Sequence, residues 1–269
     1  MSRQVQPSLC IIVPTFNSFH LLPDLVNSLT AQDSPFWSVL FVDGDSTSEH
    51  RQWLINICSS DSRFSWTPQP PDQPGIYGAM NFGFQLTHDY DWVLFWGSDD
   101  HAYSANTISQ IQSDLSSFSG PYPDIITYSG CYFDPATKLV HRRSAFYYSD
   151  SSTLPFRTLL FFGFVPIHQA TLFGRGARSR LSTYNLDYRL AADLFYFLQL
   201  SRFNSLRIYC RRNPIVSMSS GGVSGRSTFL RLLEVFKCYY SSFGSLFFIP
   251  FLCRYFHRFF AKIFFKSSP

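Results

Sequence analysis

The chain has 269 residues, of which 45% are hydrophobic and 15% charged, a balance that excludes a disordered protein and allows one large domain. Its formal net charge of +4 is too small to indicate nucleic-acid binding, so we expect no nucleic-acid partner. The six cysteines are scattered and contain no CxxC pair, which excludes a zinc cage and a disulfide scaffold and predicts reduced thiols.

Short apolar runs alternate with segments of helical periodicity through the first half of the chain. The runs predict strands at 9–13, 39–42, 64–67 and 92–96, and the periodic segments predict helices at 21–29, 49–58 and 76–86. This alternation predicts an α/β fold with a mostly parallel central sheet and right-handed crossovers. The first run is too short for a signal peptide, so we expect the domain in the cytoplasm.

The pattern is more mixed in the second half. Strands are predicted at 125–128, 170–173 and 215–218, a hairpin turn at 134–137 and a helix at 190–200. No internal repeat or low-complexity linker divides these elements, which favours a single domain. From residue 229 onward the composition shifts toward Phe, Tyr, Arg and Lys.

Polar residues follow three of the predicted strands at their carboxyl ends. They are Pro14-Thr15, Asp43-Gly44-Asp45 and Asp99-Asp100. In parallel sheets ligands bind outside the carboxyl ends of the strands, so these groups are expected to converge on one rim. This convergence predicts a ligand site.

The adjacent carboxylates of Asp99 and Asp100 are a candidate cation site. They repel each other unless a cation lies nearby, and Mg²⁺ or Mn²⁺ uses few protein carboxylates and completes its shell with phosphate and water oxygens. Such an ion would neutralise the charge that develops on a diphosphate leaving group. The alternative is that the two aspartates cap the helix that follows.

The stretch 70–100, PPDQPGIYGAMNFGFQLTHDYDWVLFWGSDD, resembles the family 2 glycosyltransferases of bacterial surface-polysaccharide synthesis. The segments IIVPTFN and FVDGDST resemble the first two strand–loop motifs of this family. Further similar segments follow in the family's order at 168–173, 188–193 and 221–224. Each segment alone is a weak signal, but their order is specific.

The resemblance implies an A-type glycosyltransferase fold and a nucleoside-diphosphate sugar, linked to UDP or GDP, as donor. The residues that it assigns to the nucleotide are Pro14, Thr15 and Asn17 in the pocket, Asp43 at the base, and Asp72, Gly75 and Tyr77 beside the base and ribose. Asp99 and Asp100 would hold the ribose and the metal-bound diphosphate, with Mg²⁺ or Mn²⁺ as cofactor.

The resemblance also implies a catalytic carboxylate. Asp193 falls where the family keeps its general base, which takes the proton of the acceptor hydroxyl in an inverting transfer. The alternative is a surface residue of an amphipathic helix, although apolar neighbours make a carboxylate costly there unless it faces a cleft. His168 is a candidate for contact with the donor phosphates or the acceptor, or else a structural histidine. Arg226, after a glycine-rich loop, is a candidate partner of the leaving group.

Two glycines depart from the family pattern. Gly97 stands where many relatives have Asp or Asn, and Gly78 replaces the aspartate of the Ile-Tyr-Asp segment. These changes affect the expected donor more than the expected reaction.

The last 43 residues form a predicted helical tail, 227–269, after a catalytic domain of 1–226. Arg254, Arg258, Lys262 and Lys266 recur every four residues and so form one basic stripe among phenylalanines. The apolar stretch 247–253 is interrupted by Pro250, and its uninterrupted part is too short to span a bilayer. An amphipathic helix of this kind lies in the interface of an anionic membrane, here the inner face of the plasma membrane. The alternative is packing on the catalytic domain or on a sister subunit.

Together these features predict a hexosyltransferase-type enzyme that transfers a sugar to a saccharide or lipid-linked saccharide in surface-polysaccharide synthesis. A nucleotidyltransferase is the competing enzyme, but it would carry a glycine-rich basic phosphate loop where this chain has PTFNSFH. A nucleotide-sugar-binding module without turnover is the non-enzymatic alternative.

Overall fold

The computed structural model describes residues 7–137, 139–144, 155–220 and 228–264. Its first half contains every element that the sequence predicts there. The elements are β1 (Leu9–Thr15), α1 (Leu22–Thr30), β2 (Ser38–Asp43), α2 (Ser48–Ser60), β3 (Phe64–Pro68), α3 (Gly75–Leu86) and β4 (Trp92–Phe95). The short strand β5 (His101–Ala102) follows without a counterpart in the sequence prediction, and the helix α4 (Thr107–Ser116) comes after it.

The second half contains longer strands than predicted. Its elements are β6 (Ile125–Phe133), β7 (Val140–Ser144), α5 (Phe156–Phe161), η1 (His168–Ala170), β8 (Thr171–Gly174), α6 (Arg175–Arg180), α7 (Ala192–Leu200) and β9 (Ile208–Ser219). The polar run Arg211-Arg212-Asn213 hides the first part of β9 from a hydrophobicity pattern. The ladder between β6 and β9 absorbs this run through register shifts on either side of Ser129.

All described strands belong to one sheet, in the order β3-β2-β1-β4-β8-β6-β9-β5, with β7 beside β6. The strands β3, β2, β1 and β4 are parallel, as predicted. The sheet as a whole is mixed, because β8 lies antiparallel between β4 and β6, and β5 and β7 are antiparallel to their neighbours. The prediction of a mostly parallel sheet therefore holds for β3, β2, β1 and β4, the part of the sheet in which the polar residues follow β1, β2 and β4.

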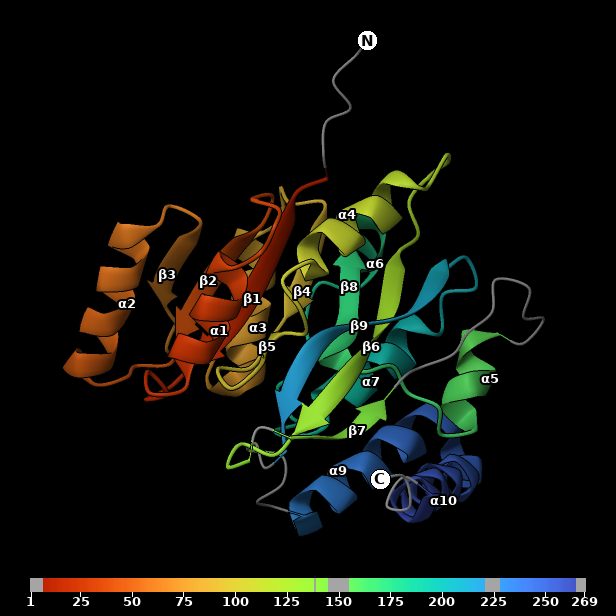
Figure 1. Ribbon diagram of the computed structural model, residues 1–269. Coiled ribbons are helices and arrows are strands. Elements are labelled where there is room, and N and C mark those ends of the chain that lie inside the picture. The colour runs from red at the N-terminus through yellow and green to blue at the C-terminus, as the bar shows by residue number, and fades with distance from the viewer. Residues whose placement is uncertain (1–6, 138, 145–154, 221–227, 265–269) are drawn as a thin grey trace.

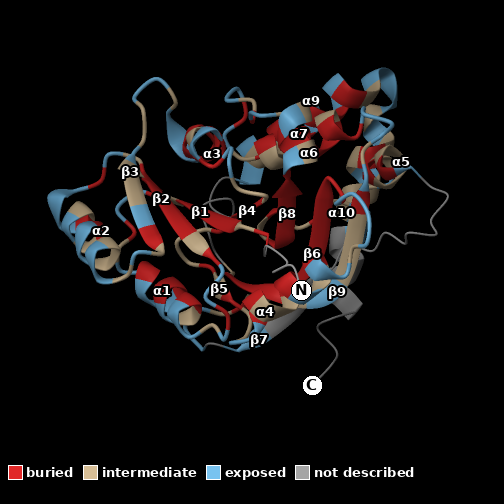
Figure 2. Ribbon diagram, turned by 90° about the horizontal axis from the view of Figure 1, so that it is seen from above, coloured by how far each residue is buried: buried red, intermediate tan, exposed pale blue. Residues whose placement is uncertain are grey.

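Helices cover both faces of this sheet (Figure 2). Along β1, Ile11 points into the core beneath α1 and α4, whereas Ile12 points into the core beneath α3 and α7. Both side chains are fully buried, which explains why the strand is a continuous apolar run rather than an alternating one. The two cores join the layers into one body.

The tail continues as α9 (Thr228–Phe243), η2 (Gly244–Phe247) and α10 (Phe248–Phe264). Figure 1 shows α9 and α10 next to each other, and Figure 2 shows α9 beside α7. Gly244, at a φ of 58°, lies at the turn between the two helices, a backbone conformation that glycine adopts readily. The face of α9 that carries Val235 and Tyr239 is buried in the core shared with α3 and α7. The first part of the tail therefore packs on the preceding domain, the alternative that the sequence left open.

Within the described residues, Thr228–His257 is long and apolar enough, by length and composition, to cross a membrane. In the structure this stretch is divided at Gly244 between α9 and α10 rather than forming one straight rod. Arg258 and Lys262 lie on α10, and Lys266 lies outside the described residues.

Candidate functional site

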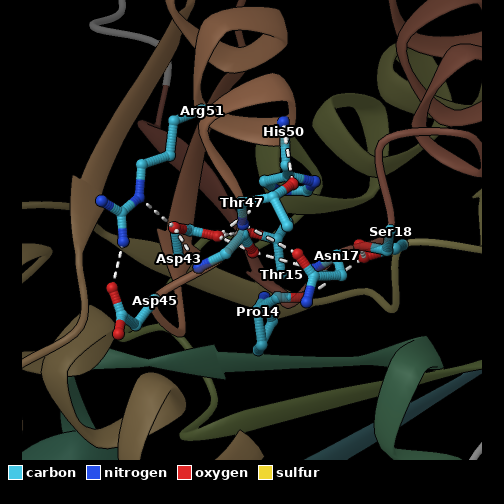
Figure 3. A network of polar contacts seen from close by, with 11 residues as sticks. Pro14, Thr15, Asn17, Ser18, Asp43, Asp45, Thr47, His50 and Arg51 are labelled. Atoms are coloured by element: carbon cyan, nitrogen blue, oxygen red, sulfur yellow. Dashed lines mark hydrogen bonds and ion pairs between the residues drawn. The ribbon is translucent and has the colours of Figure 1, made fainter.

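The rim at the ends of β1 and β2 is organised by one carboxylate, Asp43 (Figure 3). Thr15 Oγ1 donates a hydrogen bond to Asp43 Oδ1 (3.2 Å), and the backbone N–H of Ser46 donates to Oδ2 (3.1 Å). The Ser46 hydroxyl and Arg51 Nε also contact this carboxylate, which has no exposed surface. Asp43 therefore braces the loop after β2, and its expected contact with a base stays a prediction.

Asn17 connects this loop to the loop after β1. Its φ of 48° lies in the left-handed region, where asparagine is one of the tolerated residues. Its backbone N–H donates to Ser46 Oγ (2.8 Å), and its side-chain oxygen accepts from the backbone N–H of Thr47 (2.8 Å). Pro14, half-buried beside it, accepts a hydrogen bond at its carbonyl from Ser98 Oγ (3.3 Å), which ties the β1 loop to the β4 loop.

Two basic residues of α2, which the sequence analysis did not single out, face Asp43. Arg51 Nη2 bonds Asp45, whose side chain is 94% exposed. His50 Nε2 lies 3.3 Å from Asp43 Oδ1, without hydrogen-bond alignment, and both of its ring nitrogens lack a hydrogen bond within the described residues. Burial lowers the pKa of His50 more than the nearby carboxylate raises it. Arg51 is therefore the charged partner of Asp43 among the described residues. In the sequence it is only a basic residue three positions after Ser48.

Asp99 and Asp100 lie in the turn between β4 and β5. The next helix, α4, begins at Thr107 after Asn106, so the two aspartates do not cap it. Asp100 is 3% exposed, and its Oδ2 accepts the backbone N–H of Gly97 (2.6 Å). Asp99 is more exposed, so of the two it is the better placed to reach a ligand.

Asp100 is buried and Asp99 is half-buried, and no positive side chain of the described residues lowers the pKa of either carboxyl group. Burial and then the negative charge of Asp99 raise the pKa of Asp100 well above its usual value. Burial also raises the pKa of Asp99, more than the hydrogen bonds that it accepts, including one from Ser219, lower it. Within the described parts of the chain, no three His, Cys, Asp or Glu side chains are grouped so that they could hold a metal. This donor set fits a hard divalent cation that takes most of its ligands from phosphate and water.

The two glycines that differ from the family pattern, Gly97 and Gly78, are explained by steric contacts. A Cβ at Gly97 would lie 2.9 Å from Asp99 Oδ1, so a side chain there would require the Asp99 carboxylate to shift. A Cβ at Gly78 would lie 1.9 Å from the backbone oxygen of Gln73. The family's aspartate therefore does not fit the loop conformation that this chain adopts before α3.

That loop carries the other expected nucleotide residues. Asp72 is exposed, and Gly75 begins α3 with a φ of 78°. Gln69 donates its side-chain amide to the carbonyl oxygen of Gly75 (2.8 Å) and its backbone N–H to the carbonyl oxygen of Asp43 (2.8 Å). The loop is thereby bonded to the rim at the end of β2.

The structure brings Tyr77 and Asp193 together across 116 residues of sequence. Tyr77 Oη lies 3.4 Å from Asp193 Oδ1, where it donates a hydrogen bond. Burial, followed by the negative charge of Asp193, raises the pKa of Tyr77 well above its usual value, so the phenol keeps its proton. Asp193 is half-buried in the first turn of α7, and its role as the general base stays a prediction.

His168 lies in the core beside this pair. Its Nε2 is 2.8 Å from Tyr184 Oη, and its ring stacks on Phe95 with 5.3 Å between centroids. Burial lowers the pKa of His168 to about 4, against a smaller opposing effect of Asp193. His168 is therefore neutral at physiological pH, which favours the structural alternative, and its contact with donor or acceptor stays a prediction. Arg226 and the glycine-rich loop 221–224 lie outside the described residues.

Two further residues at the site were not singled out by the sequence analysis. Tyr184 exchanges backbone hydrogen bonds with the side chain of Asn81 on α3 (2.6 and 3.0 Å) and contacts His168. Glu234, on α9, is buried against the residues that precede α7. A lone acid in the basic, aromatic tail was the only available hint for Glu234.

Comparison with known sequences is consistent across most of the chain. Residues 10–173 match the profile of the family described as Glycosyl transferase family 2. Curated relatives include the PGL/p-HBAD biosynthesis glycosyltransferases of Mycobacterium tuberculosis and Mycobacterium bovis. They are 30% identical over 188 residues, which is 70% of this chain and 67% of each relative.

Solved structures of similar fold are glycosyltransferases. Residues 1–349 of TarS from S. aureus match with a TM-score of 0.67 at 15% identity, covering 93% of this chain and 72% of that one. A structure of the same TarS segment contains UDP-GlcNAc. The mannosyltransferase PcManGT from Pyrobaculum calidifontis, in complex with GDP-Man and Mn²⁺, matches with a TM-score of 0.64 at 14% identity, covering 98% and 71%. At these identities the likeness establishes the A-type glycosyltransferase fold.

Proposed function

Because the chain belongs to glycosyl transferase family 2 and is a glycosyltransferase, we propose that it transfers a sugar from a UDP- or GDP-linked donor to a saccharide or lipid-linked saccharide. The transfer is proposed to be metal-dependent and inverting, and to serve surface-polysaccharide synthesis. The observation that carries the proposal is the contact between Tyr77 and Asp193 at the rim. It joins a carboxylate of α7 to the helix that follows the nucleotide loop.

The donor binds, in this proposal, along the carboxyl ends of β1, β2 and β4. Thr15, Asn17 and the loop after β2 hold the nucleoside, and the hydrogen bonds through Asp43 and Ser46 keep these loops in register before the donor arrives. Preorganised loops reduce the ordering cost of binding. The solved neighbours with UDP-GlcNAc and GDP-Man support a nucleotide sugar and leave the base and the sugar open.

Asp99, supported by Asp100, is the proposed protein ligand of a Mg²⁺ or Mn²⁺ ion, which when bound neutralises charge on the diphosphate leaving group. The neighbour with GDP-Man and Mn²⁺ supports this assignment. Gly97 orients Asp100 through its backbone N–H (2.6 Å), and the lack of a side chain at Gly97 allows the two carboxylates to lie against its backbone.

Asp193 is the proposed general base. An inverting transfer requires a carboxylate on the face opposite the leaving group, where it accepts the proton of the acceptor hydroxyl as the new bond forms. Tyr77, protonated and bonded to Asp193 Oδ1, orients the carboxylate. The second oxygen, Oδ2, is then the one that takes the proton.

The tail is proposed to hold the enzyme at the inner face of the plasma membrane. Exposed apolar side chains, here called the tail surface, form a stripe on α9 and continue over η2 onto α10. They are Phe229, Leu233, Phe236, Tyr240, Leu246, Phe248 and Leu252. The one acid of residues 228–264, Glu234, is buried, so basic residues alone supply exposed charge to this segment. Exposed apolar side chains next to basic ones fit an anionic lipid surface.

Two alternatives are disfavoured by specific features. A nucleotidyltransferase would need a basic phosphate loop after β1, and Asn17 and Ser18 there bond to other loops instead. A binding module without turnover would not need a half-buried carboxylate at the start of α7 in contact with Tyr77.

The test of the proposal is Asp193→Asn. The variant is expected to bind UDP or GDP with Mn²⁺ as the wild type does and to lose turnover by about 100-fold or more, because only proton removal is affected. Calorimetry measures the binding, and release of UDP or GDP from a panel of UDP- and GDP-sugars, with short saccharides as acceptors, measures the turnover. Wild-type turnover in the variant would exclude Asp193 as the base.

A further inference from the structure

The first tail helix contributes a buried carboxylate to the start of α7. Glu234 is 4% exposed and accepts three backbone hydrogen bonds. Its Oε1 accepts from Arg189 (2.9 Å), and its Oε2 accepts from Leu190 (2.7 Å) and Ala191 (2.9 Å). These three residues immediately precede α7.

The start of α7 has no cap of its own. Its N-cap residue is Ala191, which has no side chain able to accept a hydrogen bond. The N–H groups at and just before a helix start need an acceptor from elsewhere, and a carboxylate is also favoured by the helix dipole. Glu234 supplies that acceptor from a helix more than forty residues further along the chain.

A second contact of α9 holds the same residue. Cys238, one helical turn after Glu234, donates its thiol to the carbonyl oxygen of Ala191 (3.6 Å) and is fully buried. Both the N–H and the carbonyl of Ala191 are therefore held by one face of α9. Asp193 lies two residues beyond Ala191, in the first turn of α7.

We propose that Glu234 is a positioning residue for Asp193, so that the tail completes the catalytic site in addition to any role at a membrane. The inference rests on the proposed role of Asp193 as the base. Without the three hydrogen bonds, the first turn of α7 is free to move, and Asp193 loses its fixed distance to Tyr77. Misplacement of a catalytic group by about 1 Å costs on the order of 100-fold in rate.

The experiment is Glu234→Gln in the full chain. Glutamine keeps the size of the side chain, but its amide has one acceptor oxygen for three N–H donors and turns its own N–H groups toward them. The expected result is a kcat lower by about 10- to 100-fold, with affinity for UDP or GDP in Mn²⁺ changed by less than about twofold. The control is Asp124→Asn, another buried carboxylate, which directly precedes β6, accepts the backbone N–H of Arg207 (2.8 Å) and pairs with Arg180 (2.8 Å).

The double variant Glu234→Gln/Asp193→Asn separates positioning from general destabilisation. If Glu234 acts through Asp193, adding Glu234→Gln to Asp193→Asn lowers the residual turnover by less than about twofold, because the two effects are not additive. Equal and independent losses in both backgrounds, or an equal loss of kcat in Asp124→Asn, would overturn the proposal. So would wild-type kcat in a folded Glu234→Gln variant.

Failure of the proposed function can be distinguished from failure of the positioning role. If Asp193→Asn alone keeps wild-type turnover, the base assignment fails whatever Glu234→Gln does. Should Glu234→Gln not fold, Cys238→Ala decides, since it removes the other contact with Ala191. It is expected to lower kcat by about threefold or more without changing nucleotide affinity, and an unchanged kcat there would overturn the positioning role.

Discussion

The two possible roles of His168 can be separated by one variant. A structural role predicts a change in the pH dependence of stability, whereas a donor-binding role predicts a loss of nucleotide binding. Burial lowers the pKa of His168 to about 4, whereas an unfolded chain titrates its histidines near 6.5. Between these values the unfolded state binds a proton that the folded state refuses. The stability contributed by neutral His168 is therefore fully present above about pH 6.5 and is lost as the pH falls toward 4.

The size of the effect follows from the two pKa values. A difference of about 2.5 units corresponds to about 3 kcal/mol once the pH is below both values, of which about 2 kcal/mol is lost between pH 7 and pH 5. The side chain is 7% exposed, so solvent screens little of this. His168→Gln removes the titrating group while keeping a polar side chain near Tyr184.

The assay is urea unfolding of wild type and His168→Gln at pH 7, 6 and 5. Buried carboxylates titrate in both proteins, so the difference between them isolates the histidine. The wild type is expected to lose about 2 kcal/mol more than the variant between pH 7 and pH 5, while both bind UDP or GDP with Mn²⁺ equally at pH 7. Parallel pH profiles, or a variant of normal stability with weakened nucleotide binding, would refute the structural role.

Three further outcomes are expected. Asp99→Asn is expected to lower Mn²⁺-dependent binding of UDP or GDP by about tenfold or more. Asp100→Ala is expected to lose this binding and about 1–3 kcal/mol of stability, because the backbone N–H of Gly97 is left unbonded. Calorimetry in which either variant binds the nucleotide as the wild type does, with the metal chelated, would contradict the metal site. Gly78→Ala is expected to cost about 1–3 kcal/mol in urea unfolding, since its Cβ meets a backbone oxygen at 1.9 Å, whereas Gly120→Ala, with nothing within 4 Å, is the control and should cost less. Leu252→Asp, at a position 63% exposed, should weaken co-sedimentation with anionic vesicles without altering unfolding, and equal sedimentation would show that the tail surface does not contact lipid.

The candidate site was predictable where its residues follow strands. A buried parallel strand has an apolar run that ends abruptly in polar residues, and this local pattern located Thr15, Asp43 and Asp99 on one rim. The order of segments resembling a known family added Tyr77 and Asp193, which lie in contact at 3.4 Å. The roles assigned to these residues stay predictions until the variants are measured.

Contacts between distant segments could not be predicted in this way. Hydrophobic periodicity shows that a segment has a buried face but does not identify what covers it. The antiparallel insertion of β8 between β4 and β6 depends on pairing across the whole second half of the chain. The burial of one face of α9 against α7 likewise appears in the sequence only as an apolar tail.

The sequence by itself determined the alternation of strands and helices, the acidic turn after β4 and the glycosyltransferase family, because each depends on residues close together or on their order along the chain. Only the tertiary structure decided that His168 is a neutral core residue and that Glu234 bonds the start of α7. The pKa of a side chain and the partner of a buried carboxylate depend on what surrounds them in space. For both residues, those surroundings come from segments far away in sequence.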